Sequence, residues 1–128
     1  TCGYVKRDVL EGIIPYTDVF LYDIKAVSED LHIEGTGFSN KAILGNLKKL
    51  SSNNAEIIIR IPIIPDFNAK TEELEKIADF LHNLKYKSIE LLPYHQMSEH
   101  KYAALNMPFT SYPLPDKDDV EAYKKLFI

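Results

Sequence analysis

The chain has 128 residues, of which 45% are hydrophobic and 27% charged, proportions typical of one globular domain rather than of a disordered segment. Its formal net charge is −4, with 15 Lys and Arg against 19 Asp and Glu, so no overall basic character favours nucleic acid or an anionic membrane as a partner. No apolar run approaches the roughly 20 residues that span a bilayer, and the N-terminus lacks the pattern of a secretion signal, so we expect a cytoplasmic protein.

Helical and strand-like patterns alternate along the chain. The strand-like segments are short apolar runs rich in β-branched residues, and the helical segments carry apolar side chains at helical spacing. Asn40 and Thr71 are expected to cap the two clearest helices. In chain order, the patterns predict a helix over 6–14, a strand over 18–24, a helix over 40–50, a strand over 56–64, a helix over 71–84, a strand over 88–93 and a helix over 116–127.

The segments between these elements are predicted to be loops. Residues 35–38, which include two glycines, are expected to turn the chain after the first strand. His32 and His100 lie in polar stretches without a partner at the spacing of metal ligands. A zinc or iron site built from this chain alone is therefore not expected.

The order of the elements predicts an α/β fold. Two successive βαβ units imply a parallel sheet with right-handed connections, and the nearly continuous hydrophobicity of the strands predicts that both faces of the sheet are covered. Three strands are too few to close a barrel, and residues 1–4 resemble the exit from an earlier strand. We therefore interpret residues 1–128 as a single domain that is a fragment of a larger sheet.

Polar side chains follow or interrupt all three predicted strands. Asp23 and Lys25 lie two residues apart at the end of the first strand and so project from the same face. Arg60 stands among isoleucines in the second strand, where a guanidinium needs an anion or a carbonyl as partner, and His95 follows the third strand. Active sites of parallel α/β folds lie at the carboxyl ends of the strands. These side chains therefore predict one shared site for a ligand with carboxylate or hydroxyl groups.

Structural explanations remain open for each of these residues. Asp23 and Lys25 could form an ion pair that only stabilises the strand end. Arg60 could pair with Asp23 or with Glu90, and His95 could be a satisfied structural residue. A lysine enzyme that forms a Schiff base on Lys25 is disfavoured, because Asp23 beside it would keep the ammonium charged.

Several short motifs follow one another along the chain: T-C-G-Y at 1–4, L-Y-D-I-K at 21–25, T-G-F-S-N at 36–40, I-R-I-P-I-I-P at 59–65, and L-L-P-Y-H at 91–95 followed by H-K-Y at 100–102. In order and spacing they resemble the C-terminal half of the glycyl-radical-enzyme activating proteins of the radical S-adenosylmethionine superfamily, and most nearly pyruvate formate-lyase activating enzymes. The resemblance covers nearly the whole chain. It implies the C-terminal half of an incomplete (β/α)6 TIM-like barrel, with parallel strands alternating with helices.

The resemblance also implies roles for the residues at the strand ends. Asp23 and Lys25 match the pair that contacts the ribose and carboxylate region of S-adenosylmethionine. Arg60 and His95 match residues that face the methionine and adenosine portions of that cofactor. Thr1 and Asp23 match positions near a bound monovalent cation. The resemblance gives no residue of this chain a catalytic role.

Cofactors and partners follow from the same resemblance. In this family a reduced [4Fe-4S] cluster donates an electron to the bound sulfonium, and the released 5′-deoxyadenosyl radical removes a hydrogen atom from a glycine of the partner enzyme. The implied partner is a glycyl radical enzyme, most nearly pyruvate formate-lyase. The implied electron donor is a flavodoxin or a ferredoxin.

Two motifs of the family do not occur in this sequence: the C-x-x-x-C-x-x-C triplet that ligates the cluster, and the Gly-Gly-Glu segment that grips the methionine amine. Cys2 is the single cysteine. We therefore expect the activity to belong to a longer parent protein, and this part alone to be inactive. The alternative is a non-catalytic half-barrel module that docks to a partner protein through an exposed strand edge.

Overall fold

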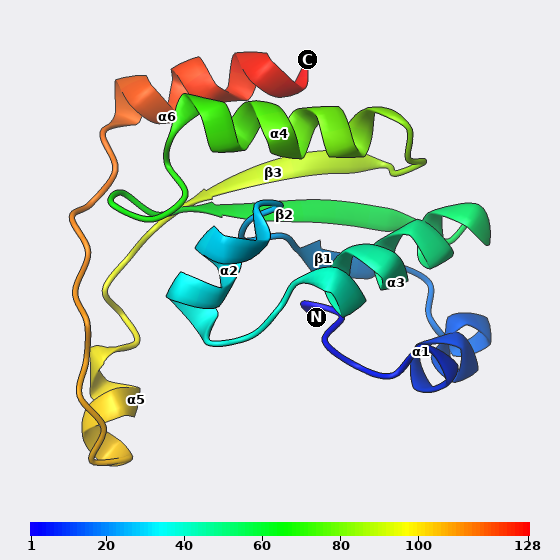
Figure 1. Cartoon of the computed structure of the whole chain (residues 1–128), viewed down its shortest axis with the longest axis horizontal. Coiled ribbons are helices and arrows are strands. Elements are labelled where there is room, and N and C mark those ends of the chain that lie inside the picture. Colours follow the sequence, from blue (N-terminus) through cyan, green and yellow to red (C-terminus); the bar gives the residue numbers. More distant parts are fainter.

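The computed structural model describes residues 1–128 and is built on a parallel sheet of three strands in the order β1-β2-β3 (Figure 1). Helices lie in both connections between the strands, so the predicted α/β fold is confirmed. No helix combines the length and the apolar character that crossing a membrane requires. The elements are α1 (Arg7–Ile13), β1 (Phe20–Asp23), α2 (Glu29–Thr36), α3 (Lys41–Ser52), β2 (Ile57–Ile63), α4 (Thr71–His82), β3 (Ser88–Pro93), α5 (Glu99–Ala104) and α6 (Lys117–Lys124), with 3-10 turns at Ile14–Tyr16 and Lys125–Phe127.

One face of the sheet carries the hydrophobic core. Alternate residues of β2, namely Ile57, Ile59, Ile61 and Ile63, are fully buried. They belong to one cluster with apolar side chains of α3, α4 and α6, and α4 and α6 lie side by side in Figure 1. Because burying a side chain of this size stabilises a fold by about 1.5–3 kcal/mol, this row of isoleucines anchors the helices to the sheet.

The opposite face of the sheet is open, so the prediction that both faces are covered is wrong. Leu21 of β1 and Leu92 of β3 are 42% and 37% exposed, and Ile58 and Pro62 of β2 are only partly buried. The β2 sequence is continuously apolar because its open face also carries apolar residues. That composition does not distinguish one covered face from two.

The structure contains two short helices where loops were predicted. α2 has 8 residues and buries only His32, and α5 has 6 residues and buries none. Neither has the repeated apolar spacing by which a helix is recognised in a sequence. His32 and His100 therefore lie on helices. The turn predicted at 35–38 is present at Gly37. This residue ends α2 in the left-handed conformation, with φ 80°.

The other predicted boundaries lie close to the observed ones. The predicted strand 88–93 coincides with β3, and the remaining elements begin and end within three residues of their predicted limits. Thr71 is the first residue of α4, so Lys70 and not Thr71 occupies the N-cap position. Asn40 occupies the N-cap position of α3, but its side chain makes no capping hydrogen bond.

The first residue of the chain pairs with the outer edge of β1. The N-terminal ammonium of Thr1 donates to the carbonyl of Leu21 at 2.9 Å, and the carbonyl of Thr1 accepts from the N–H of Asp23 at 2.9 Å. Two such bonds, to residues on either side of Tyr22, form the bridge of a parallel strand pair. This geometry agrees with the prediction that residues 1–4 leave a strand.

A close contact between Gly3 and Tyr22 joins this opening segment to the core. The phenol of Tyr22 is fully buried and donates to the carbonyl of Ile43 at 2.7 Å. Burial, and to a lesser degree the nearby Cys2 thiol, raise the pKa of Tyr22 well above its usual value. Gly3 lies directly against this ring with φ 69°, and Asn46 donates to its carbonyl at 2.8 Å.

Candidate functional site

Charged side chains from all three strands lie in a row across the open face of the sheet. The register aligns Asp23 of β1 with Arg60 of β2, and Arg60 with Glu90 of β3. Their neighbours Tyr22 and Ile59 face the core, so by the alternation of a strand the charged residues face the other side. Asp23 is the last residue of β1, so the row reaches the carboxyl edge, where ligands bind in parallel α/β sheets.

Asp23 and Arg60 form a bidentate ion pair. Arg60 Nε donates to Asp23 Oδ1 at 2.8 Å, and Arg60 Nη2 donates to Asp23 Oδ2 at 3.2 Å. The side chains are 28% and 26% exposed. Of the two partners considered for the guanidinium, the structure therefore has Asp23 and not Glu90. The pair orients the carboxylate while leaving it accessible from the open face.

Lys25 lies two residues beyond the end of β1 and is partly buried. It forms no ion pair with Asp23 or with any other residue. A partly buried ammonium without a carboxylate partner is suited to an anionic group of a ligand. Lys25 lines a hollow of about 180 Å³ together with Cys2, Tyr4, His32, Thr36, Phe38 and Ile43.

Thr1 lies next to the Asp23–Arg60 pair, whereas His95 lies on the segment that follows β3. Thr1 adjoins Asp23 through the hydrogen bond from the Asp23 N–H to the Thr1 carbonyl. His95 lies two residues after the last register pair of β2 and β3, Ile63 with Pro93, and its side chain is exposed. The structure thus brings together Thr1, Asp23 and Arg60, and leaves His95 on the connection that follows β3.

A buried polar network holds the backbone that carries Lys25. Asn68 Nδ2 donates to the carbonyl of Lys25 at 2.7 Å. Asn40 Nδ2 donates to the carbonyls of Ala26 at 3.0 Å and Val27 at 2.8 Å. Glu73 Oε1 accepts from the N–H of Val27 at 2.6 Å. The three side chains that form this network, Asn40, Asn68 and Glu73, are 2%, 0% and 4% exposed.

This network was not among the predicted features, although the sequence contains a signal for it. Glu73 lies one and two turns before Ile77 and Leu81, on the buried stripe of α4. A carboxylate on an apolar stripe indicates a buried hydrogen-bonding role, because a buried charge must be satisfied. Its partners could not be predicted, because they lie more than 40 residues away in the chain.

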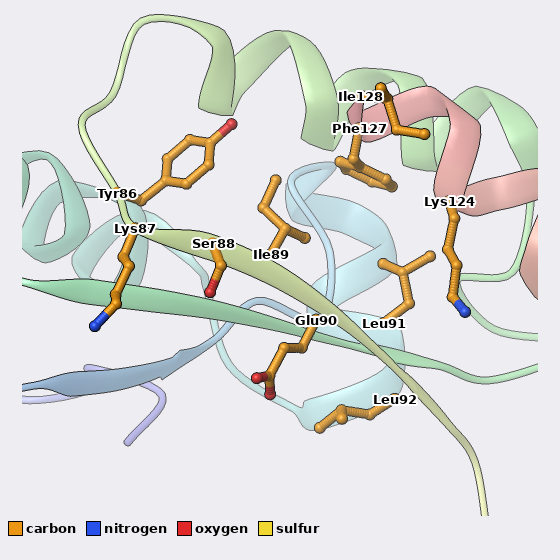
Figure 2. A pocket seen from close by; sticks show the side chains of 10 residues that line it. All are labelled: Tyr86, Lys87, Ser88, Ile89, Glu90, Leu91, Leu92, Lys124, Phe127 and Ile128. Atoms are coloured by element: carbon orange, nitrogen blue, oxygen red, sulfur yellow. The ribbon is translucent and has the colours of Figure 1, made fainter.

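The largest hollow described lies elsewhere, along the free edge of β3, with a volume of about 720 Å³ (Figure 2). Figure 2 shows Ile89 on the side of β3 that faces Phe127, while Glu90 points to the other side. Asp23, Lys25 and Arg60 do not line it. The candidate site is therefore identified by its polar side chains and not by the size of a cavity.

The side chains of this chain do not fit an iron-sulfur cluster. Cys2 is the single cysteine, and no three His, Cys, Asp or Glu side chains are grouped as metal ligands. His32 is occupied structurally, since its Nδ1 lies 2.7 Å from the carbonyl of Phe38 and 3.1 Å from the hydroxyl of Thr36. A cluster would have to be ligated by residues other than these.

The sequence is similar to parts of longer proteins, although no family model matches it. The trans-4-hydroxy-L-proline dehydratase activating enzyme of Clostridioides difficile is 43% identical, over 99% of this chain and 43% of the relative. The choline trimethylamine-lyase activating enzyme of Oleidesulfovibrio alaskensis is 36% identical, over 85% of this chain and 36% of the relative. The (2S)-3-sulfopropanediol dehydratase activating enzyme of Klebsiella oxytoca is 38% identical, over 83% and 34%. The chain spans less than half the length of these relatives.

Two solved structures share the fold. A domain of a pyruvate-formate lyase-activating enzyme from Bacteroides vulgatus matches with a TM-score of 0.78 at 21% identity, over 95% of this chain and 68% of that one. A radical SAM methyltransferase from Sphaerobacter thermophilus matches with a TM-score of 0.72 at 11% identity, over 95% of this chain and 35% of that one. These comparisons confirm the predicted partial-barrel fold and the resemblance that the sequence motifs indicated.

Proposed function

We propose that this chain, which resembles glycyl-radical-enzyme activating enzymes over nearly its whole length, is part of a radical S-adenosylmethionine enzyme that installs a radical on a glycine of a partner enzyme. In the full-length protein its three strands would supply one wall of the cofactor site. The observation that carries the proposal is the pairing of Asp23 with Arg60 on the open face, with the unpaired Lys25 just beyond it.

The charges at the strand ends fit S-adenosylmethionine. Lys25 would bind the carboxylate of the cofactor, since its ammonium has no carboxylate partner within the chain. Asp23 has two acceptor positions engaged by Arg60, and its remaining lone pairs would accept from the ribose hydroxyls. When bound, the cofactor supplies, after one-electron reduction, the group that takes the hydrogen atom from glycine.

Other groups would complete the site. We propose that His95 contacts the adenosine portion and that Thr1 and Asp23 adjoin a monovalent cation. The [4Fe-4S] cluster would be held outside this chain, because Cys2 cannot ligate it alone. A flavodoxin or a ferredoxin would supply the electron. A cytoplasmic location for the whole protein stays a prediction from the sequence.

The partner that we propose is a glycyl radical enzyme. Pyruvate formate-lyase, which the motifs imply, is one candidate, and the names of the relatives add dehydratases and a choline trimethylamine-lyase. The partner can be identified by mixing the reduced full-length protein, in separate reactions, with one purified member of each class. The member that acquires a glycyl radical is the partner.

The full-length protein, reconstituted anaerobically with iron and sulfide and then reduced, is expected to cleave S-adenosylmethionine. The measurements are the 5′-deoxyadenosine formed and the doublet of a glycyl radical in the electron paramagnetic resonance spectrum of the partner. A sample without reductant serves as the control. If the full-length protein neither bound nor cleaved S-adenosylmethionine, the proposal would fail, and a non-catalytic docking module would be favoured.

Replacing Arg60 by alanine in the full-length protein is expected to weaken S-adenosylmethionine binding by about tenfold, because Asp23 loses the two donors that orient it. Stability should fall by only about 1 kcal/mol, since the pair is partly exposed. Isothermal titration calorimetry and thermal unfolding measure the two effects. Lys87→Ala is the control, because it breaks the exposed pair with Glu56 and removes the same charge. A loss of stability with unchanged affinity would make Arg60 purely structural.

A further inference from the structure

We propose that Glu73, on helix α4, is a positioning residue for the cofactor site: it holds the backbone of residues 25–28, which carries Lys25 two residues beyond Asp23. The inference rests on the proposed function, because it concerns the binding of S-adenosylmethionine. Glu73 itself would not touch the cofactor. It would act through the segment that carries Lys25.

All the hydrogen bonds of the Glu73 carboxylate go to this one segment. Its Oε1 accepts from the N–H of Val27 at 2.6 Å and from the N–H of Ser28 at 2.9 Å. Its Oε2 accepts from the hydroxyl of Ser28. The residue is 4% exposed, and no lysine, arginine or histidine forms an ion pair with it. Three donors from two consecutive residues therefore satisfy a buried charge.

The contact between Ser28 and Glu73 replaces the usual N-terminal cap of α2. Ser28 occupies the N-cap position of α2, where a serine hydroxyl usually accepts from an N–H of the first turn. Here the Ser28 side chain makes no capping bond, and its hydroxyl donates to Glu73 instead. The Glu73 carboxylate therefore supplies hydrogen-bond acceptors to Val27 and Ser28.

Two other buried side chains hold the carbonyls of the same segment. Asn68 binds the carbonyl of Lys25, and Asn40 binds those of Ala26 and Val27. Glu73 provides the acceptor for the two N–H groups that these amides leave free. Side chains from α4, from the loop after β2 and from the start of α3 therefore fix the consecutive peptide groups between Lys25 and Ser28. A fixed backbone limits the positions that the Lys25 ammonium can take and so favours binding of one ligand group.

The test compares variants of Glu73 in the full-length protein. Glu73→Ala is expected to raise both the Kd and the KM for S-adenosylmethionine on the order of 10-fold to 100-fold while kcat at saturation changes much less, because Lys25 is displaced from the cofactor carboxylate. Glu73→Gln should retain affinity within about threefold, because its amide oxygen can still accept both N–H groups and the Ser28 hydroxyl can turn to accept from its NH₂. Glu75→Ala, at an exposed position of the same helix, should leave both parameters unchanged.

The outcomes separate this inference from the proposed function. If the wild-type protein binds no S-adenosylmethionine, the proposed function fails. If the wild type binds and Glu73→Ala loses stability but keeps the wild-type Kd and KM, or if glutamine does not restore affinity, the positioning role is overturned. Should the alanine variant not fold, Glu73→Met, which fills a similar volume without an acceptor, takes its place. Hydrogen exchange gives a second readout, since the amide protons of Val27 and Ser28 should exchange faster in the alanine variant only.

Discussion

Gly3→Ala is expected to destabilise the protein by about 2–5 kcal/mol, because the new methyl group meets two separate obstacles. A Cβ at this position would overlap the ring of Tyr22, which is fully buried and tied to the carbonyl of Ile43. The backbone there has φ 69°, a left-handed conformation that disfavours a side chain. Urea unfolding followed by circular dichroism measures the loss.

Gly12→Ala is the matched control for this change. Gly12 lies in α1, its φ is not positive, and nothing lies within 4 Å of a Cβ added there. Alanine should therefore stabilise the protein by about 0.5–1 kcal/mol through its better helix propensity. Equal free energies of unfolding for the two variants would show that the contact between Gly3 and Tyr22 does not constrain the opening segment.

Asn68→Ala is expected to cost about 2–5 kcal/mol, because one fully buried side chain makes three hydrogen bonds. Its Nδ2 donates to the carbonyls of Lys25 and Pro62 at 2.7 and 2.6 Å, and its Oδ1 accepts from the N–H of Ile64 at 2.8 Å. Asn68→Asp should cost more than alanine at pH 7, although it is nearly the same shape. The aspartate would set an unscreened negative charge against two carbonyl oxygens.

The pH dependence of the aspartate variant tests this explanation. Lowering the pH protonates the carboxylate, so the free energy of unfolding of Asn68→Asp relative to the wild type should recover as the pH falls from 7. Asn53→Ala is the control, because Asn53 makes an exposed hydrogen bond to Lys49 and its loss should cost below about 1 kcal/mol. An aspartate variant as stable as the alanine variant at pH 7 would contradict the orientation assigned to the amide.

The sequence predicted the sheet and the larger helices because their stabilising interactions repeat along the chain. The buried isoleucines of β2 alternate, and Leu74, Ile77 and Leu81 of α4 recur at helical spacing. α2 and α5 were missed because they carry little of this repeat. Whether the second face of the sheet is covered could not be predicted, since an apolar residue such as Ile58 occurs on covered and open faces alike.

The sequence indicated which residues could form the candidate site, and only some of the contacts between them could be predicted. The position of polar residues at the end of the first strand indicated Asp23 and Lys25, and the charge within an apolar strand indicated Arg60. The need of a guanidinium for an anion left Asp23 as one of two possible partners. The choice depends on register, which places Asp23 beside Arg60 and is a property of two strands and not of one. Lys25 forms no ion pair with Asp23. It lies beyond the last residue of β1, where the strand alternation that predicted a shared face no longer applies.

The ion pair between Asp23 and Arg60 also favours one register of β1 against β2. A slip of β1 by one residue would turn its side chains to the wrong face of the sheet. A slip by two residues restores the faces, but it sets either Leu21 or Lys25 opposite Arg60. The first removes the carboxylate that Arg60 binds on β1, and the second opposes two cations, so the observed alignment is the one that gives Arg60 its Asp23 partner. The ion pair that we propose to orient Asp23 for the cofactor thereby also disfavours misaligned pairing of β1, the strand that carries Asp23.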